Sequence, residues 1–200
     1  MKNLLFGFAL CLSLSAFSQP QKGNFLLSGN FSVINNKDKR FSNNDVLYHN
    51  TQNSFSIMVE AAYFVSDRIS VGLFDRQEFS KRINDNDEVY NDNINSLAIA
   101  GRFYIPVKKG GIFFENFAGL NFGKSEGPGG TDKISGCFAG ISPAVYYYIT
   151  GRIALEAEFG SILYDYRKTK AEGSAFYFTA SDFSFLFSPW NLSLGMSFTF

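Results

Sequence analysis

The sequence ends with Trp190-Asn191-Leu192-Ser193-Leu194-Gly195-Met196-Ser197-Phe198-Thr199-Phe200. Every second residue of this stretch is large and apolar, and the residues between them are asparagine, serine, glycine or threonine. Successive side chains of a β-strand point to opposite faces, so the pattern predicts a strand with one apolar and one polar face. Such a strand fits a wall between an apolar and a polar environment, and it also fits the last strand of a soluble β-sandwich.

The first eighteen residues have the composition of a secretory signal. Lys2 is followed by a mainly apolar stretch, and Ala16-Phe17-Ser18 offers a small-x-small cleavage site. The stretch is too short and too rich in serine to cross a membrane as a helix. We therefore expect residues 1–18 to be removed, which leaves Cys137 as a single thiol that cannot form an internal disulfide.

The composition narrows the class of protein. Aromatic residues make up 18% of the chain, yet the mean hydropathy is only −0.05. This combination is typical of a membrane barrel, in which only every second strand residue meets lipid. The net charge is zero, so nothing indicates nucleic-acid binding. Beyond the signal no segment is long and apolar enough for a spanning helix, and residues 19–200 suit a single domain.

Eight alternating segments can be drawn along the chain. They are Asn24–Val33, Ser54–Val65, Ile69–Phe79, Asn95–Ile105, Ile112–Gly123, Ser135–Ile149, Ile153–Tyr164 and Phe183–Phe200. Short connections follow the second, fourth and sixth segments, and long polar ones follow the others, namely Ile34–Asn53, Ser80–Ile94, Lys124–Ile134 and Asp165–Asp182. We predict an all-β fold, an eight-stranded antiparallel up-and-down transmembrane β-barrel with four long extracellular loops.

The residues assigned to the outward face support this prediction. No charge appears among them, and their aromatic side chains gather at two levels. We assign Phe25, Tyr63, Phe103 and Tyr147 to a belt near the short connections, and Phe31, Phe122 and Trp190 to a belt near the long ones. Pro143 interrupts the sixth segment, where we expect a bulge that Gly136 and Gly140 would help to form.

Together these features resemble the small eight-stranded outer-membrane barrels of the OmpA/OmpX type, and the outer membrane protein beta-barrel domain family of Gram-negative bacteria. The resemblance is carried by the turns at Tyr63–Ile69 and Tyr146–Ile153, the strand end Gly101–Tyr104 and the terminal stretch Ser193–Phe200. It implies a place in the bacterial outer membrane, with Gly195, Phe198 and Phe200 as an assembly signal for the barrel-insertion machinery. The family defines no catalytic residue, so we expect no enzyme, no cofactor and no metal.

The inward face carries the candidate site. Its charged residues are Glu60, Arg102, Glu115, Glu156 and Glu158. The interior of an eight-stranded barrel is just wide enough for side chains to fill it, so these groups predict a hydrogen-bonded polar core. Four carboxylates facing one arginine are unbalanced, and unpaired charges are costly to bury. A narrow path for small cations or protons is therefore an alternative, and Arg76 is a further candidate to balance the charge.

Other polar residues offer weaker hypotheses. His49 is the only histidine, and a lipid-modifying enzyme centred on it is a second alternative. The acidic residues Asp85, Asp87, Glu88 and Asp92 suggest a divalent cation but lack the spacing of a calcium loop. The basic residues Lys37, Lys39, Arg40, Arg167, Lys168 and Lys170 offer charges to lipopolysaccharide phosphates. We predict a monomer with a structural or surface-interaction role, in contact with outer-membrane lipid and lipopolysaccharide.

Overall fold

The computed structural model describes residues 21–42, 45–84, 88–172, 176–187 and 192–200, and for residues 36–42 and 45–50 it describes the backbone alone. The predicted signal segment and Trp190 lie outside the described residues. The regular elements of the described part are ten β-strands. They are β1 (Phe25–Ser42), β2 (Asp45–Ser66), β3 (Ile69–Ile83), β4 (Val89–Val107), β5 (Gly110–Gly127), β6 (Gly130–Tyr148), β7 (Ile153–Glu158), β8 (Ser161–Ala171), β9 (Phe178–Leu186) and β10 (Ser193–Thr199).

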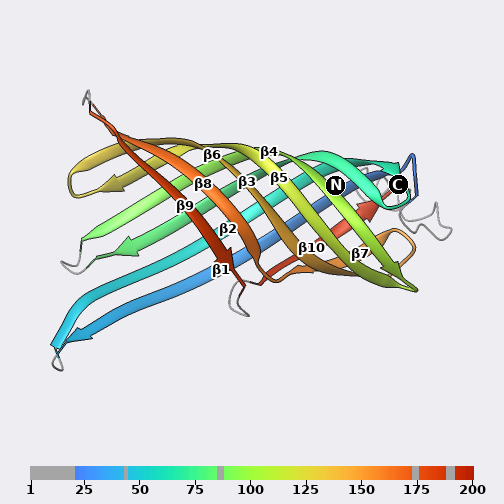
Figure 1. The fold of residues 1–200 in the computed structure, drawn as a ribbon, viewed down its shortest axis with the longest axis horizontal. Helices are drawn as coiled ribbons and strands as arrows, with labels where there is room; N and C mark the ends of the chain where they lie inside the picture. The colour runs from blue at the N-terminus through green and yellow to red at the C-terminus, as the bar shows by residue number, and fades with distance from the viewer. Residues whose placement is uncertain (1–20, 43–44, 85–87, 173–175, 188–191) are drawn as a thin grey trace, which may run out of the picture.

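The strands form one antiparallel sheet whose pairings close into a ring (Figure 1). Each of β1 to β6 pairs with the next strand along the chain, and β10 pairs with both β7 and β1. The ring therefore passes through eight strands. β8 pairs with the remaining part of β6, and β9 pairs with β8. No helix in the described part of the chain is long and apolar enough to cross a membrane.

The strands of the ring are staggered. Pairing partners followed from Phe31 through β2, β3, β4 and β5 lead to Ser135 on β6. Partners followed from Phe31 in the other direction, through β10 and β7, lead to Val145 on the same strand, ten residues further along. In a closed sheet a stagger of this kind requires the strands to tilt against the ring axis. Figure 1 shows this tilt clearly.

The two faces of the strands meet different surroundings. On β4, Ile99 is 62% exposed on the outward face, whereas its neighbour Ala100 is 3% exposed inside the ring. The same alternation of exposed apolar and buried side chains follows the other strands of the ring. On β3 the outward face continues beyond the residues assigned from the sequence, with the exposed carboxylate Asp75. The outward face is therefore mainly apolar but not free of charge.

The last two predicted segments are each divided, which gives ten strands rather than eight. Between the pairs Ala144–Glu158 and Ile141–Ile162, three residues (159–161) oppose two (142–143). Pro143 has no N–H to donate at this point. The bulge expected at Pro143 therefore lies on the opposing chain, and Gly160, with φ of +128°, adopts the unusual backbone rather than Gly136 or Gly140. The last segment follows the same division, since β9 pairs with β8 and β10 with β7.

The four long loops predicted from the sequence are mostly strand. The hairpin of β1 and β2 continues past Ile34 and Asn53 to the pair Ser42–Asp45, with one shift of register between Arg40 and Phe41. The polar ends of β3 to β6 are paired in the same way, as far as Ile83–Val89 and Gly127–Gly130. Backbone pairing does not need an apolar face, so it extends beyond the alternating part of each segment. What projects from this end is a set of long hairpins, of which β1–β2 reaches furthest in Figure 1.

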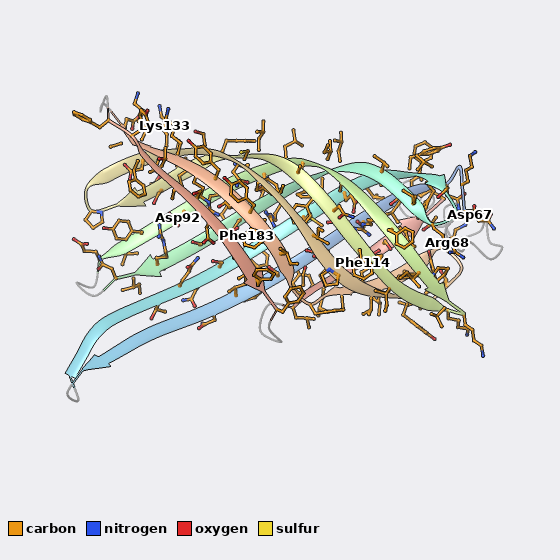
Figure 2. The ribbon with its side chains drawn as sticks, in the orientation of Figure 1. Asp67, Arg68, Asp92, Phe114, Lys133 and Phe183 are labelled. Atoms are coloured by element: carbon orange, nitrogen blue, oxygen red, sulfur yellow. The ribbon has the colours of Figure 1, made fainter. Side chains whose placement is uncertain are left out.

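The opposite end holds the short connections and both ends of the described chain. In Figure 2, Asp67 and Arg68 lie at this end and Lys133 lies at the other. The N–H of Phe25 donates to the carbonyl of Phe200 at 2.7 Å, and the N–H of Phe200 donates back at 3.0 Å. These bonds continue the pairing of β1 with β10 that closes the ring.

We predict that Gly160→Ala lowers the free energy of unfolding by about 1–3 kcal/mol, because glycine adopts the φ of Gly160 without strain and alanine does not. A Cβ there would also lie 2.3 Å from the carbonyl oxygen of Leu186. Equilibrium unfolding in urea measures the change. Gly129→Ala is the control, because a Cβ at Gly129 meets no atom within 4 Å. Equal stability of the two variants would contradict the strand break described above.

Candidate functional site

Arg102 lies at the centre of the polar network inside the ring. It points inward from β4 and is 1% exposed. Its cross-strand partner on β5 is Glu115, and its Nε donates to Glu115 Oε2 at 2.7 Å. Its Nη1 donates to Glu156 Oε2 on β7 at 3.0 Å, and its Nη2 pairs with Glu60 Oε2 on β2. One guanidinium therefore connects β4 to three other strands of the ring.

Ser28 adds a fifth strand to the network. Its hydroxyl on β1 accepts a hydrogen bond from Arg102 Nη2 at 3.1 Å and donates to Glu60 Oε2 at 3.0 Å. The sequence analysis did not select Ser28, although the alternation of β1 places it on the inward face next to Leu26. Hydrogen bonds to charged groups are stronger than those between neutral groups. Ser28 therefore helps to hold the buried ion pair of Arg102 and Glu60 in one geometry.

An aromatic layer lies on the short-connection side of the network. The guanidinium carbon of Arg102 lies 4.6 Å from the ring centre of Phe113, within the range of a cation–π contact. Tyr104 lies next to it, with ring centres 5.3 Å from Phe64, 5.4 Å from Phe113 and 5.5 Å from Tyr146. These rings belong to one buried cluster, which fills the interior between the network and the short connections.

A second apolar layer lies on the other side of the network. Phe74, Phe117 and Phe138 form a triangle with ring centres 5.9 to 6.3 Å apart. The order of residues along β4 shows the arrangement, because Ala98 and Ala100 belong to this second cluster and Tyr104 to the first, with Arg102 between them. The ion network is therefore enclosed between two apolar layers.

The charges of the network are not balanced. Three carboxylates share the guanidinium of Arg102, and Glu60 Oε1 has no hydrogen-bond partner among the described residues. Glu158 also points inward, but it is bound by Asn30, whose Nδ2 donates to Glu158 Oε1 at 2.9 Å. Arg76 does not supply the missing charge, since its guanidinium lies over the Phe138 ring at 5.5 Å and forms no ion pair in the described part of the chain.

The interior is also polar beyond the second apolar layer. Ser96 donates to Asn121 Oδ1 at 2.8 Å, and Asn121 Nδ2 donates to Asp165 Oδ1 at 3.0 Å. Nearer the long hairpins, Asp92 accepts hydrogen bonds from Ser80 and Ser125 and pairs with Arg82 at 3.1 Å. The bonds of Ser96 and Asp92 connect neighbouring strands, whereas that of Asn121 with Asp165 connects β5 to β8.

The other predicted site residues lie on the outward face or at the ring closure. Phe25 contacts Tyr63 and Phe200, with ring centres 5.1 and 6.3 Å apart. The remaining described members of the two belts, Phe31, Phe103, Phe122 and Tyr147, are exposed on the outward face. Phe198 and Phe200 share this face on or next to β10, whereas Gly195 faces inward, where an added Cβ would lie 2.7 Å from the Cβ of Asn30.

The weaker hypotheses are only partly covered by the described residues. The side chains of His49, Lys37, Lys39 and Arg40 lie outside them, as do Asp85 and Asp87. Glu88 binds Asn84 and Tyr90 instead of a cluster of acids, and no group of three possible metal ligands occurs in the described ranges. Arg167 pairs with Asp165, and the Lys168 ammonium lies 3.9 Å from the Tyr177 ring centre.

Comparisons with known proteins find likeness in solved structures alone. No protein-family model matches the sequence, and no curated protein does. The chain is similar to the translocator domain of the autotransporter NalP from Neisseria meningitidis (12% identity, TM-score 0.46), covering 92% of this chain and 64% of that one. It is also similar to a major outer membrane protein from Thermus thermophilus (13%, 0.47; 90% and 100% covered). A third similar structure is an outer membrane channel from Pseudomonas putida (8%, 0.29; 93% and 98%).

We predict that Arg102→Gln lowers the free energy of unfolding by about 3–5 kcal/mol, because it leaves buried carboxylates without their counter-charge. Adding Glu60→Gln, Glu115→Gln and Glu156→Gln should recover much of the loss, because no unpaired charge then remains. Urea unfolding measures both changes.

Arg82→Gln is the control for this experiment. The Arg82 side chain is 44% exposed, so loss of its pair with Asp92 should cost no more than about 1 kcal/mol. If Arg102→Gln were as mild as Arg82→Gln, the network would not hold the strands together.

Proposed function

We propose that this chain is an eight-stranded outer-membrane β-barrel of a Gram-negative bacterium, a monomer without catalytic activity. The observation that carries the proposal is the distribution of polarity around the ring. Large apolar side chains are exposed outward on every strand of the ring, whereas Arg102 and three glutamates are buried inside it. In water this distribution would be unfavourable, because apolar surface would be exposed and charge desolvated. In a lipid bilayer the outward face is matched to its surroundings.

Two further features support a bilayer. Pairing of Leu26–Ser32 with Ser193–Thr199 satisfies the strand edges in that part of the wall, and a chain in hydrocarbon must satisfy its backbone groups internally. Aromatic side chains lie near both ends of the apolar face, at Phe25 and Tyr63 on one side and at Phe55 and Phe122 on the other. Such belts are typical of the two lipid–water interfaces. The exposed Asp75 is the exception, and a carboxylate on the lipid-facing side costs less than an arginine or lysine would.

The proposed role is structural, or an interaction at the cell surface through the projecting hairpins. The two apolar layers on either side of Arg102 support a closed interior, which argues against the alternative of a narrow cation channel. No observation favours the alternative of a lipid-modifying enzyme. Partners of this proposal are outer-membrane lipid and lipopolysaccharide, and the barrel-insertion machinery during assembly.

We predict that Ile99→Arg lowers the stability of the protein in lipid vesicles by about 2–4 kcal/mol, because it places a guanidinium in hydrocarbon. Val107→Arg is the matched control, since Val107 is 63% exposed on the same face of β4 but lies beside the short connection. Near the interface the same change should cost about 0–1 kcal/mol. Both sites are exposed, so a soluble protein would tolerate both equally, and equal effects in urea titrations would refute the membrane location.

We also predict that the purified protein produces no stable current in a planar lipid bilayer. Apolar clusters lie on both sides of the Arg102 network, and we expect them to keep water and ions from it. Single-channel recording at both polarities is the measurement, with a known open porin as the positive control. A reproducible cation-selective current that changes in Glu60→Gln would replace the closed-interior proposal with the channel alternative.

A further inference from the structure

A groove of about 930 Å³ lies in the outer wall near the long hairpins. It is formed by β2 to β5 and bordered by Val33 of β1, and most of its lining side chains belong to the outward face. The Asp92 label in Figure 2 marks this region, at the end opposite to Asp67 and Arg68. The groove therefore occupies the part of the wall where the apolar face gives way to the polar hairpins.

The lining changes from aromatic to polar along the strands. Phe55, Phe79 and Phe122 are exposed in the groove and continue the apolar face of β2, β3 and β5. On β4 the outward residues at this level are asparagines. Asn95 lies opposite Phe122, and Asn93 lies opposite Phe79. An asparagine amide has two donors and an acceptor, so this row can bind the hydroxyl groups of a sugar from either side.

Two lysines border the polar side of the groove. Lys81 on β3 pairs in register with Asn91, and Lys124 on β5 pairs with Asn93, so the lysines flank β4. Neighbouring strands lie about 4.8 Å apart, and the partners Asn91 and Asn93 are two residues apart on β4, so the Cα atoms of the two lysines are roughly 12 Å from each other. Neither ammonium forms an ion pair within the part of the chain that the structure describes.

The acidic residues of the groove do not cancel these charges. Asp92 points inward and is already bound by Arg82, Ser80 and Ser125. Glu126, further along β5, is the one other carboxylate of the lining. The groove therefore has two lysines without carboxylate partners and one exposed carboxylate. Its net charge is positive, which suits an anionic ligand.

We propose that this groove binds the phosphate-bearing sugar headgroup of an outer-leaflet glycolipid, the lipid A part of lipopolysaccharide. The inference rests on the proposed membrane location. In this arrangement Lys81 and Lys124 bind phosphates and the asparagines of β4 bind the sugar. The acyl chains pack against the phenylalanines, which lie beside the asparagines and continue into the apolar face. The site differs from the basic residues of β1 and β8 that the sequence suggested, because it combines charge, amides and an apolar floor on one face.

The test uses the full protein folded in detergent micelles and titrated with bis-phosphorylated lipid A, with bound lipid counted by native mass spectrometry. We expect one tightly bound molecule. The double variant Lys81→Ala and Lys124→Ala should raise the dissociation constant about tenfold or more, because two charge-assisted contacts are lost. The matched control is Lys22→Ala with Lys109→Ala, which removes the same charge from the opposite, short-connection end of the ring and should change binding less than about twofold.

A second ligand tests the phosphate itself. Dephosphorylated lipid A should bind the unaltered protein about tenfold more weakly or worse. Absence of binding, equal losses in the two double variants, or equal binding of both lipids would overturn the proposal. A gel that shows the folded band before boiling confirms that each variant is folded. Cell fractionation tests the membrane location separately, so failure of the groove and failure of the proposed function give different results.

Discussion

The pairing of β1 with β10 is the interaction on which the ring depends. It joins the beginning of the described sheet to its end over Leu26–Ser32 and Ser193–Thr199, and without it two strand edges would be open. An open edge exposes unpaired backbone groups, which is tolerated poorly in water and not at all in hydrocarbon. Only seven of the eighteen residues of β1 take part. Beyond Ser32 no other described strand pairs with the free side of β1, and β9 pairs with β8 alone.

The Arg102 network lies in the part of the ring that is closed. Ser28 belongs to the paired stretch of β1, and Glu156 lies opposite Gly195 of β10. The guanidinium therefore connects β4 across the interior to the strands on both sides of the closure. A buried ion network is weak evidence for extra stability, because desolvation offsets much of the attraction. Its clearer effect is specificity, since a shift of one strand by one residue would turn its charged group outward.

The closed half could be predicted from the sequence because its two faces meet different surroundings. Asn95–Ile105 and Ile112–Gly123 alternate strictly, and this alternation gave the inward position of Arg102 and Glu115. The hairpin ends could not be predicted in this way. In Ile34–Asn53 both faces are polar, so pairing continues while the alternation disappears. Contacts across the ring, such as that of Arg102 with Glu156, depend on the stagger of the strands. The stagger cannot be predicted from the alternation within one segment. Phe113 was missed for another reason, because it lies beside Arg102 within the β4–β5 pair but only charged residues were considered on the inward face.

The outward face is not equally apolar all round the sheet, because it is more polar beside β3 and β4 than beside β9. Below the groove, Gln77 on β3 lies opposite Asn95 on β4, and Asp75 is the next outward residue of β3. On β9 the outward positions are instead Phe183 and Phe185. A carboxylate facing hydrocarbon is costly unless water or polar groups reach it. If the sugar of a headgroup lies at Asn95 and Gln77 while its phosphates stay at Lys81 and Lys124, its hydroxyl groups and their water reach toward Asp75, and the cost of that carboxylate falls. The exposed charge on β3 and the polar groove above it then have one physical explanation, because both require polar groups to reach deeper beside β3 and β4 than beside β9.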